Sequence, residues 1–462
     1  MRKFRRRDEQ INQQELWVRP QELVMGAQDG FYSKLNKVLA GMQFTEAVHA
    51  QCAPYYKTGT SSGGRPPVDP VVMFKMLVVG FLEGIGSERG IASRCADSLT
   101  IRRFLGYSLT EQTPEHSSFT VFRQRLPQEV FDAVHAVILQ GLRAHGLLKG
   151  KHLGIDSSVM EANASLSGLA SRNTEQSYRD YVKELARQAG VDAEDPAAVA
   201  RFDRKRQGRK TSNQDWYNPD DPDAKVGRTK HGACDMIHKP EHIVDLESGA
   251  IIAAEVRPGD AADTEDLANR VRGAVETLEE IVGAAHEQGE SCVKSLTGDK
   301  GFHDPRELGI IHHELGLRTV IGDAHAERRC VERLEPEALQ ALRRATRAVR
   351  SQSGKALLKA RGEHIERGFA HVLDSGGLRR TTLRGREKIN KRYLCGIIAF
   401  NLCLIMRKLL GRGTPKQMAA AGRAFWAWIL ALRQAWGALF TQLEIRIAHR
   451  FCGPTMRRPF SC

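Results

Sequence analysis

The chain is predicted to be an α/β protein with a mixed sheet flanked by helices, preceded by an all-helical part. After about residue 150, apolar runs of strand length alternate with amphipathic helical patterns. Before it, short helical patterns are separated by glycine and proline turns. A length of 462 residues indicates two or three domains, which we place at 1–150, 151–410 and 411–462.

The composition is strongly basic. There are 69 Lys and Arg residues against 55 Asp and Glu, a net charge of +14, which favours a polyanionic partner, with simple solubility as the alternative. No uncharged apolar run is long enough for a membrane span, and no apolar run follows the basic start MRKFRRRDEQ. The nine cysteines form no CxxC pair, which argues against a disulfide framework or a zinc ribbon and favours the cytoplasm.

The first 150 residues are predicted to form a helical bundle. The prolines of GRPPVDPVVMFKMLVVGFLEG suit a helix start, and Ser87 can cap the next helix. Ser117 and Ser118 precede a further helix that would end with Arg123 and Arg125 exposed. This pattern favours a DNA-binding helix-turn-helix arrangement, with a plain helical domain as the alternative.

The second part begins with a short strand, His152 to Ile155, that ends at Asp156. A polar insertion over 162–232 looks poorly suited to a core. Then follow, in order, a hairpin that turns at Glu247–Gly249, an amphipathic helix, a strand before Asp299, a helix near 304–316 and a strand near 317–323. A basic, Arg- and Ala-rich helical segment (329–361) precedes two more helices, and a partly amphipathic helix is expected in the tail after residue 411.

Asp156 and Asp299 are the first candidate functional residues, because ligands bind at strand ends in α/β sheets. Two carboxylates that meet there repel each other, and one takes up a proton unless a cation intervenes. Oxygen ligands without a nearby Cys or His pair favour Mg²⁺ or Mn²⁺ over zinc. The stretch LTGDKGFHDP could equally be a tight turn and nothing more.

A third acid is available in the helix GEHIERGFAH. Its apolar stripe contains Ile365, and Glu366 borders that stripe, whereas Glu363 is spaced to pair with Arg367 at the surface. The spacing therefore favours Glu366 over Glu363.

These segments, in this order, resemble the motifs of bacterial insertion-sequence DDE transposases with an RNase H-like core. The resemblance spans roughly residues 60–415 and is carried by IDSSVMEANAS, GDKGFHD and GEHIERGFAHVLDSGGLRRTTLRGREKINKRYL, with the helical motifs upstream. It implies Asp156, Asp299 and Glu366 as catalytic residues and ligands of two Mg²⁺ or Mn²⁺ ions. The match is incomplete, because Leu358 and Leu373 stand where many relatives have Tyr and Lys.

The implied function is cleavage at the ends of a mobile element and joining of those ends to target DNA. Its partners would be double-stranded DNA, as terminal inverted repeats and target, and a second copy of the chain in a synaptic dimer. No membrane is expected, and the protein would be cytoplasmic, at the nucleoid when bound to DNA. The alternatives are an RNase H-like nuclease without strand transfer, a catalytically inactive DNA-binding regulator, and a basic structural protein.

Basic side chains are the candidates for contacts with DNA phosphates. Besides Arg123 and Arg125 they are Lys205, Arg206, Lys300, Arg367, Arg379, Arg380, Arg384, Lys388, Lys391 and Arg392. Trp216 and Tyr217 could stack on an unpaired base or pack inside the insertion. His303 could contact the scissile phosphate or cap the following helix.

Overall fold

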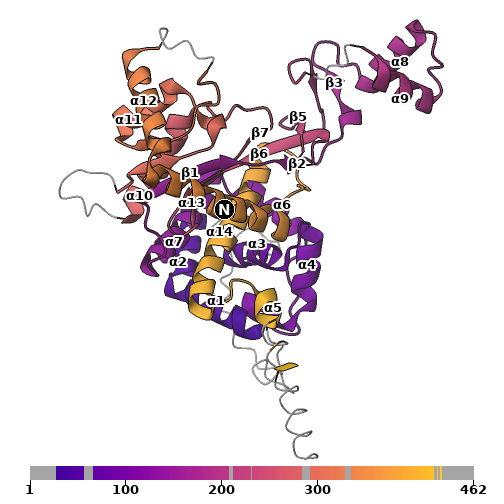
Figure 1. Ribbon diagram of the computed structural model, residues 1–462. Helices are drawn as coiled ribbons and strands as arrows, with labels where there is room; N and C mark the ends of the chain where they lie inside the picture. The colour runs from indigo at the N-terminus through magenta and orange to yellow at the C-terminus, as the bar shows by residue number, and fades with distance from the viewer. Residues whose placement is uncertain are drawn as a thin grey trace, which may run out of the picture.

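The computed structural model describes residues 28–56, 66–207, 212–229, 231–282, 292–327, 334–420, 424 and 427–428. It is a mixed α/β structure, with a central sheet above a group of N-terminal helices (Figure 1). Two lobes extend from opposite sides of the sheet, one containing α11 and α12 and the other α8 and α9. The predicted fold class is therefore confirmed, while most of the predicted tail helix lies outside the described residues.

Seven helices precede the sheet in the described chain. Asp69 accepts from the Val71 N–H at 2.8 Å and starts α3, and the Ser87 Oγ accepts from the Gly90 N–H at 3.1 Å and starts α4, as predicted. The helices α3 and α4 meet at 96°, within the range of helix-turn-helix pairs. The helices are α1 (Asp29–Gly41), α2 (Phe44–Cys52), α3 (Pro70–Glu83), α4 (Glu88–Asp97), α5 (Leu99–Leu105), α6 (Ser117–Arg125) and α7 (Gln128–Ala144).

The sheet is mixed, with the described strands in the order β2-β6-β1-β8-β9, and β5 and β7 paired to β6. β1 runs parallel to β8, β8 parallel to β9, and β1 antiparallel to β6. The predicted hairpin is β6–β7. The strands are β1 (His152–Ser157), β2 (Met160–Glu161), β5 (Lys225–Arg228), β6 (Cys234–Asp245), β7 (Ile251–Pro258), β8 (Ser295–Thr297) and β9 (Arg318–Val320).

Helices on both sides of the sheet follow the predicted order. The helix that contains Glu366 is longer than predicted, because it continues the basic segment before it and passes into a π-helical segment, η6 (Ala370–Ser375). The flanking elements are α10 (Leu267–Val282), η4 (Lys300–Phe302), α11 (Pro305–Leu315), α12 (Pro336–Arg350), α13 (Gln352–Phe369) and α14 (Arg386–Leu410).

Helix α14 packs against α7, α3 and β7. The N-terminal helices and the sheet therefore share one continuous hydrophobic core, and the division into domains at residue 150 stays a prediction. By length and apolar composition alone, the stretch Arg386–Ala420 could cross a membrane. Its apolar window is 72% buried inside the protein, as in the core helix of a globular fold.

Two asparagines of α14 bind the backbone of β7. Among the described strands β7 pairs with β6 alone, so its other edge exposes polar backbone groups. The Asn401 amide accepts from the Ile251 N–H at 3.0 Å and donates to the Ile251 carbonyl at 2.8 Å. Asn390 accepts from the Val256 N–H at 3.0 Å. The helix therefore satisfies part of the sheet edge that it covers.

The polar insertion has small cores of its own, so its predicted lack of a core is wrong. Trp216 is buried against Tyr178 and Tyr181, with ring centroids 5.1 and 5.3 Å away. Three aromatic rings supply enough apolar area to hold short elements together despite the polar composition. These elements are η3 (Leu166–Gly168), β3 (Ala170–Ser171), α8 (Tyr178–Gln188), α9 (Pro196–Lys205) and β4 (Trp216–Tyr217).

Replacing Asn401 with Leu should destabilise the protein by about 3–5 kcal/mol, because it leaves several buried polar groups without a partner. The groups are both backbone atoms of Ile251 and the ring Nε2 of His135, which lies 3.1 Å from the Asn401 amide nitrogen. Denaturant unfolding of Asn401→Leu measures the loss. Asn390→Leu is the control, since this half-buried residue gives the strand one hydrogen bond and should cost about 1 kcal/mol. Equal losses would contradict the assigned role of Asn401.

Candidate active site

The two predicted aspartates follow neighbouring parallel strands. Gly154 of β1 pairs with Thr297 of β8, and both strands continue toward the same edge of the sheet. Asp156 is the fifth residue of β1, and Asp299 comes two residues after the end of β8. The arrangement is the one that the sequence pattern predicts for this pair.

Asp156 is a partly buried carboxylate with two close polar contacts. Its Oδ1 accepts from the Ser157 N–H at 2.8 Å, and its Oδ2 lies 2.6 Å from the guanidinium of Arg361. Burial raises its pKa to about 6, although Arg361 and the Ser157 N–H act in the opposite direction. The negative charges of Asp299 and Asp263 raise the pKa further, so the expected repulsion between carboxylates is present.

Asp299 begins the turn of η4 and is exposed. Its Oδ1 accepts from the Gly301 N–H at 2.8 Å, an arrangement that fixes the carboxylate beside the backbone. A Cβ at Gly301 would lie 3.1 Å from that oxygen and 3.0 Å from Oδ2 of Asp263. Glycine at this position therefore lets the turn fit between two carboxylates, so the stretch is both a tight turn and part of an acidic site.

Asp263 is a third acid at this site, and the sequence analysis missed it. Its Oδ1 accepts from the Ser157 hydroxyl at 2.8 Å and lies 2.7 Å from Nζ of Lys239. It lies in the loop after β7, within the acidic run GDAADTED. Its position soon after a strand was an available signal, but nothing in the run separates Asp263 from its acidic neighbours.

Helix α13 lies against β1 and carries the third predicted acid. The helix can lie this close because Gly154 has no side chain. A Cβ at that position would lie only 3.0 Å from the Cδ1 of Ile365. Arg361, one turn earlier, reaches both the Ile155 carbonyl and Asp156. Glu366 is exposed, and its Oε1 lies 3.9 Å from the Cβ position of Gly362, so its side chain points back toward the turn that holds Arg361.

Glu363 forms the predicted surface ion pair with Arg367, at 2.9 Å. The other acid of this helix, Glu366, forms no ion pair with a described residue. Nowhere in the described chain are three acidic, His or Cys side chains close enough together to enclose a metal ion. The structure thus brings Asp156 and Asp299 together and leaves Glu366 outside their immediate contacts.

The chemistry of the donors fits a hard divalent cation in part. Asp156, Asp299 and Asp263 supply carboxylate oxygens, the donors that such a cation prefers, and burial followed by the charges of the neighbouring carboxylates raises the pKa of Asp156 to about 6. However, Arg361 already contacts one oxygen of Asp156, and Lys239 one oxygen of Asp263. The carboxylates are therefore of the type that binds a hard divalent cation, but Arg361 and Lys239 already contact some of their oxygens.

Three of the predicted DNA-contacting side chains are buried, and those predictions are wrong. Arg123 is 3% exposed and forms an ion pair with Glu88 through both guanidinium nitrogens. Lys391 donates to Glu387 and to the Arg123 carbonyl, and Arg392 donates to the Ile85 carbonyl at 3.4 Å. All three lie where α14 meets the N-terminal helices, so their stems contribute to packing.

Four other predicted contacts are arginines with acidic partners. Arg206 lies 2.7 Å from Asp203, Arg379 2.7 Å from Asp374 and Arg384 3.1 Å from Asp220, besides the Glu363–Arg367 pair. Lys205, Lys300, Arg380 and Lys388 are exposed and remain accessible to a polyanion.

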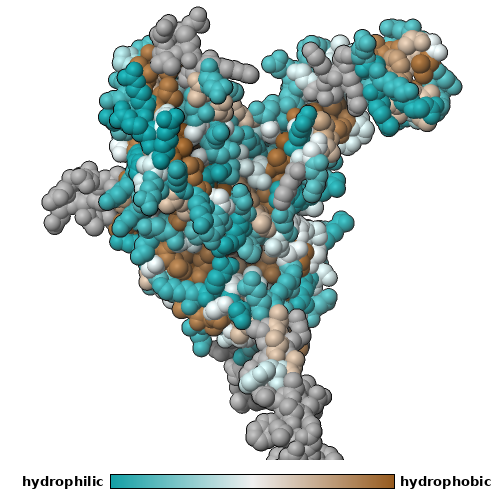
Figure 2. Space-filling view, viewed as in Figure 1, coloured by the Kyte–Doolittle hydropathy of each residue, from teal (hydrophilic) through white to brown (hydrophobic). Residues whose placement is uncertain are grey.

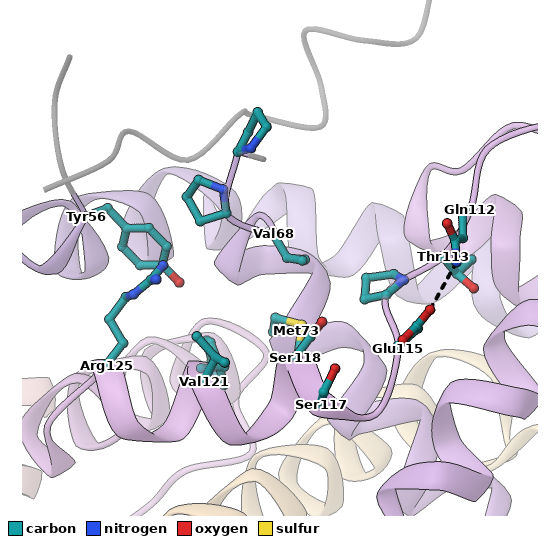
Figure 3. A pocket seen from close by; sticks show the side chains of 14 residues that line it. Tyr56, Val68, Met73, Gln112, Thr113, Glu115, Ser117, Ser118, Val121 and Arg125 are labelled. Atoms are coloured by element: carbon teal, nitrogen blue, oxygen red, sulfur yellow. Dashed lines mark hydrogen bonds between the residues drawn. The ribbon is translucent and has the colours of Figure 1, made fainter. Parts of the chain in front are cut away.

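Arg125 is half-buried and lies over the ring of Tyr56, 4.6 Å from its centroid (Figure 3). Both residues line a pocket of about 260 Å³ beside α6, together with Val121 and the two serines at the start of that helix. The cation–π contact holds the Arg125 side chain at the pocket.

Two open alternatives are resolved by burial. Trp216 belongs to the insertion core and is not an exposed stacking surface, whereas Tyr217 is half-buried beneath Arg172. His303 is buried, with Nδ1 3.0 Å from the Ile321 carbonyl. Asp304 caps α11, so the expectation that His303 is the cap is wrong.

Asp156→Asn should stabilise the protein, and more so at high pH. Because the carboxyl pKa is about 6 in the folded state against 3.8 in the unfolded state, ionisation costs stability as the pH rises through this range. The expected gain is about 1.5 kcal/mol at pH 5 and about 3 kcal/mol at pH 8. Unfolding of both proteins at the two pH values tests this, with the exposed Asp97→Asn as the control. An equal gain at both pH values would contradict the raised pKa.

Comparison with known proteins supports one part of the chain directly. Residues 21–125 match the family described as "Transposase domain (DUF772)". The comparisons with curated proteins and with solved structures gave no significant match. The matched range contains helices α1 to α6, upstream of the aspartate site. The N-terminal helical part is thus similar to a transposase domain over less than a quarter of the chain, and this similarity supports an insertion-sequence transposase.

Proposed function

We propose that the protein is a transposase of the DDE type, which cuts DNA at the ends of its element and joins those ends to target DNA. The observation that carries the proposal is the pair Asp156 and Asp299 on adjacent parallel strands, with the pKa of Asp156 raised to about 6 by burial and neighbouring carboxylates. The N-terminal transposase domain makes DNA the expected substrate.

In this proposal Asp156 and Asp299 hold divalent cations, Mg²⁺ or Mn²⁺, and Glu366 completes the set. Bound metal ions would lower the pKa of an attacking water or DNA 3′-hydroxyl and stabilise the leaving oxygen. Asp156 would hold the central place among the ligands, because it interacts electrostatically with Asp299 and is in contact with Arg361 of α13.

Arg361 has a positioning role in the proposal. Its guanidinium contacts Asp156 at 2.6 Å and neutralises part of the negative charge of the acidic site. A cation held by Asp156 would supply that charge instead, and Arg361 could then bind a DNA phosphate, to which its planar fork is well matched. Glu366 lies on the same helix five residues later, and its side chain already points toward the turn that holds Arg361.

Accessible basic side chains support DNA as the partner. Lys300 is exposed next to Asp299, and Arg380 and Lys388 are exposed before and within α14. Each phosphate contact adds affinity that falls with salt. The proposed reaction also calls for a dimer, which would bring two element ends together. It would place the protein at the nucleoid, where the DNA lies.

The proposal predicts Mg²⁺-dependent cutting of a DNA that is flanked by the terminal inverted repeats of the element. Asp299→Asn and Glu366→Gln should each lower the cleavage rate at least about 100-fold, since each removes a metal ligand, and should leave DNA binding intact. Cleavage, joining of cut ends to a target and DNA binding are measured separately, which also distinguishes a transposase from a nuclease.

Glu363→Gln is the matched control, because it removes an acid three residues from Glu366 whose partner is the surface residue Arg367. It should keep the wild-type rate. Full activity of Asp299→Asn would exclude the metal mechanism, and loss of activity in Glu363→Gln with retention in Glu366→Gln would reverse the assignment of the third acid. Cutting without joining would favour the nuclease, and binding without cutting would favour the regulator.

A further inference from the structure

A basic pocket lies in the α11–α12 lobe, and none of the residues that line it is among the DNA contacts discussed above. It has a volume of about 360 Å³ and is lined by His312, Arg318, Thr319, Ala341, Arg344, Arg347, Ala348 and Ser351. Three arginines line it and no acidic residue does. The outer surface of this lobe, at the upper left, is mostly hydrophilic in Figure 2.

The shape of the pocket is fixed by close packing of α12. Its buried face consists of Ala338, Ala341, Ala345 and Ala348, small residues that let the helix lie close to α11 and β9. The corner between α12 and α13 is equally tight, because a side chain at Gly354 would overlap the Ala348 carbonyl. Arg344 and Arg347, which line the pocket beside this face, therefore project from a rigid support.

The charge of these arginines is not neutralised within the described chain. Arg344 and Arg347 are exposed and have no acidic partner among the described residues. Arg318 is held by neutral groups, with its nitrogens 2.8 Å from the Ser351 hydroxyl and 3.0 Å from the Ser353 hydroxyl. Elsewhere Arg123, Arg206, Arg361, Arg379 and Arg384 all pair with carboxylates. The pocket thus concentrates uncompensated positive charge.

We propose that Arg344 and Arg347, with Arg318 behind them, bind the phosphate backbone of the DNA that flanks the cleavage point. The inference rests on the proposed function and adds a second DNA contact to it. Arg318 pairs with Ser295 at the start of β8, and Asp299 follows the end of the same strand. That separation is roughly 13 Å at the usual strand rise, about four base pairs along a duplex. One DNA segment can therefore contact both places.

The test compares two double variants in the full-length protein. Arg344→Ala/Arg347→Ala removes the pocket arginines, whereas Arg343→Ala/Arg350→Ala removes two exposed arginines of the same helix that do not line the pocket. Both double variants remove two positive charges, and both replace Arg with Ala, so they affect the stability of the helix equally. Binding to a duplex of the element end is measured against salt concentration.

The pocket variant should bind roughly tenfold or more weakly at 0.1 M salt, and its slope of log affinity against log salt should be about two units shallower, one per lost contact. The control variant should stay close to wild type, and Arg344→Lys/Arg347→Lys should recover much of the binding. A thermal melt checks that all the variants are folded. Equal weakening of both Ala variants would overturn the proposal in favour of a general charge effect.

Other outcomes separate this inference from the proposed function. If the wild-type protein fails to bind or cut the duplex, the proposed function itself fails. If it cuts normally and the pocket variant binds like wild type, only the pocket inference fails. Inorganic phosphate is the probe for a small anion: a phosphate-dependent rise in melting temperature that the pocket variant loses, with unchanged duplex binding, would overturn DNA as the ligand.

Discussion

The fold depends on the burial of α14. This helix contacts α3 and α7 on one side and β7 on the other, so it joins the N-terminal helices to the sheet in one core. Leaving its long apolar sequence exposed to water would be unfavourable, because exposure costs about 25 cal/mol for each Å² of apolar area. Its polar residues act at the contacts: Asn401 and Asn390 bind the edge of β7, and Lys391 and Arg392 bind backbone carbonyls of the helical part.

This burial has a consequence for how the N-terminal helices, which match the transposase domain family, are placed relative to the candidate active site. Arg123 lies at the C-terminal end of α6 and pairs with Glu88 of α4, while its carbonyl accepts from Lys391 of α14. Helices α4 and α6 therefore have fixed positions relative to the sheet. A DNA duplex bound by α4 and α6 would therefore have a defined orientation relative to the sheet edge that carries Asp156 and Asp299.

The strands could be predicted from the sequence because they depend on local pattern, and the same pattern marks Asp156 and Asp299 as candidates. A short apolar run that ends in Asp156 or Asp299 can be recognised without knowledge of its neighbours, and the parallel pairing of β1 and β8 follows from the order of elements. Asp263 was missed because it lies in a loop, where no periodicity marks which acid points inward. Its assignment requires its contacts with Ser157 and Lys239, which are distant in sequence.

The arginines were predicted least well, and the reason is physical. A guanidinium on a long apolar stem can serve as a surface charge, as half of an ion pair or as a packing element, and the choice depends on what lies opposite. Arg123 and Arg392 looked like DNA contacts in a basic sequence but face a helix interface. The insertion was predicted to be poorly suited to a core for a similar reason. Three aromatic rings among many charged residues suffice for a small core.

Asp156 and Arg361 together explain how three aspartates can lie near one another in the folded protein. Burial and the charges of Asp299 and Asp263 oppose ionisation of Asp156, while Arg361 favours it. The same guanidinium that stabilises the carboxylate also contacts the oxygen that a metal ion would need. Because Arg361 and Glu366 share α13, and Ile365 between them packs close to Gly154, a shift of the helix would displace both side chains together.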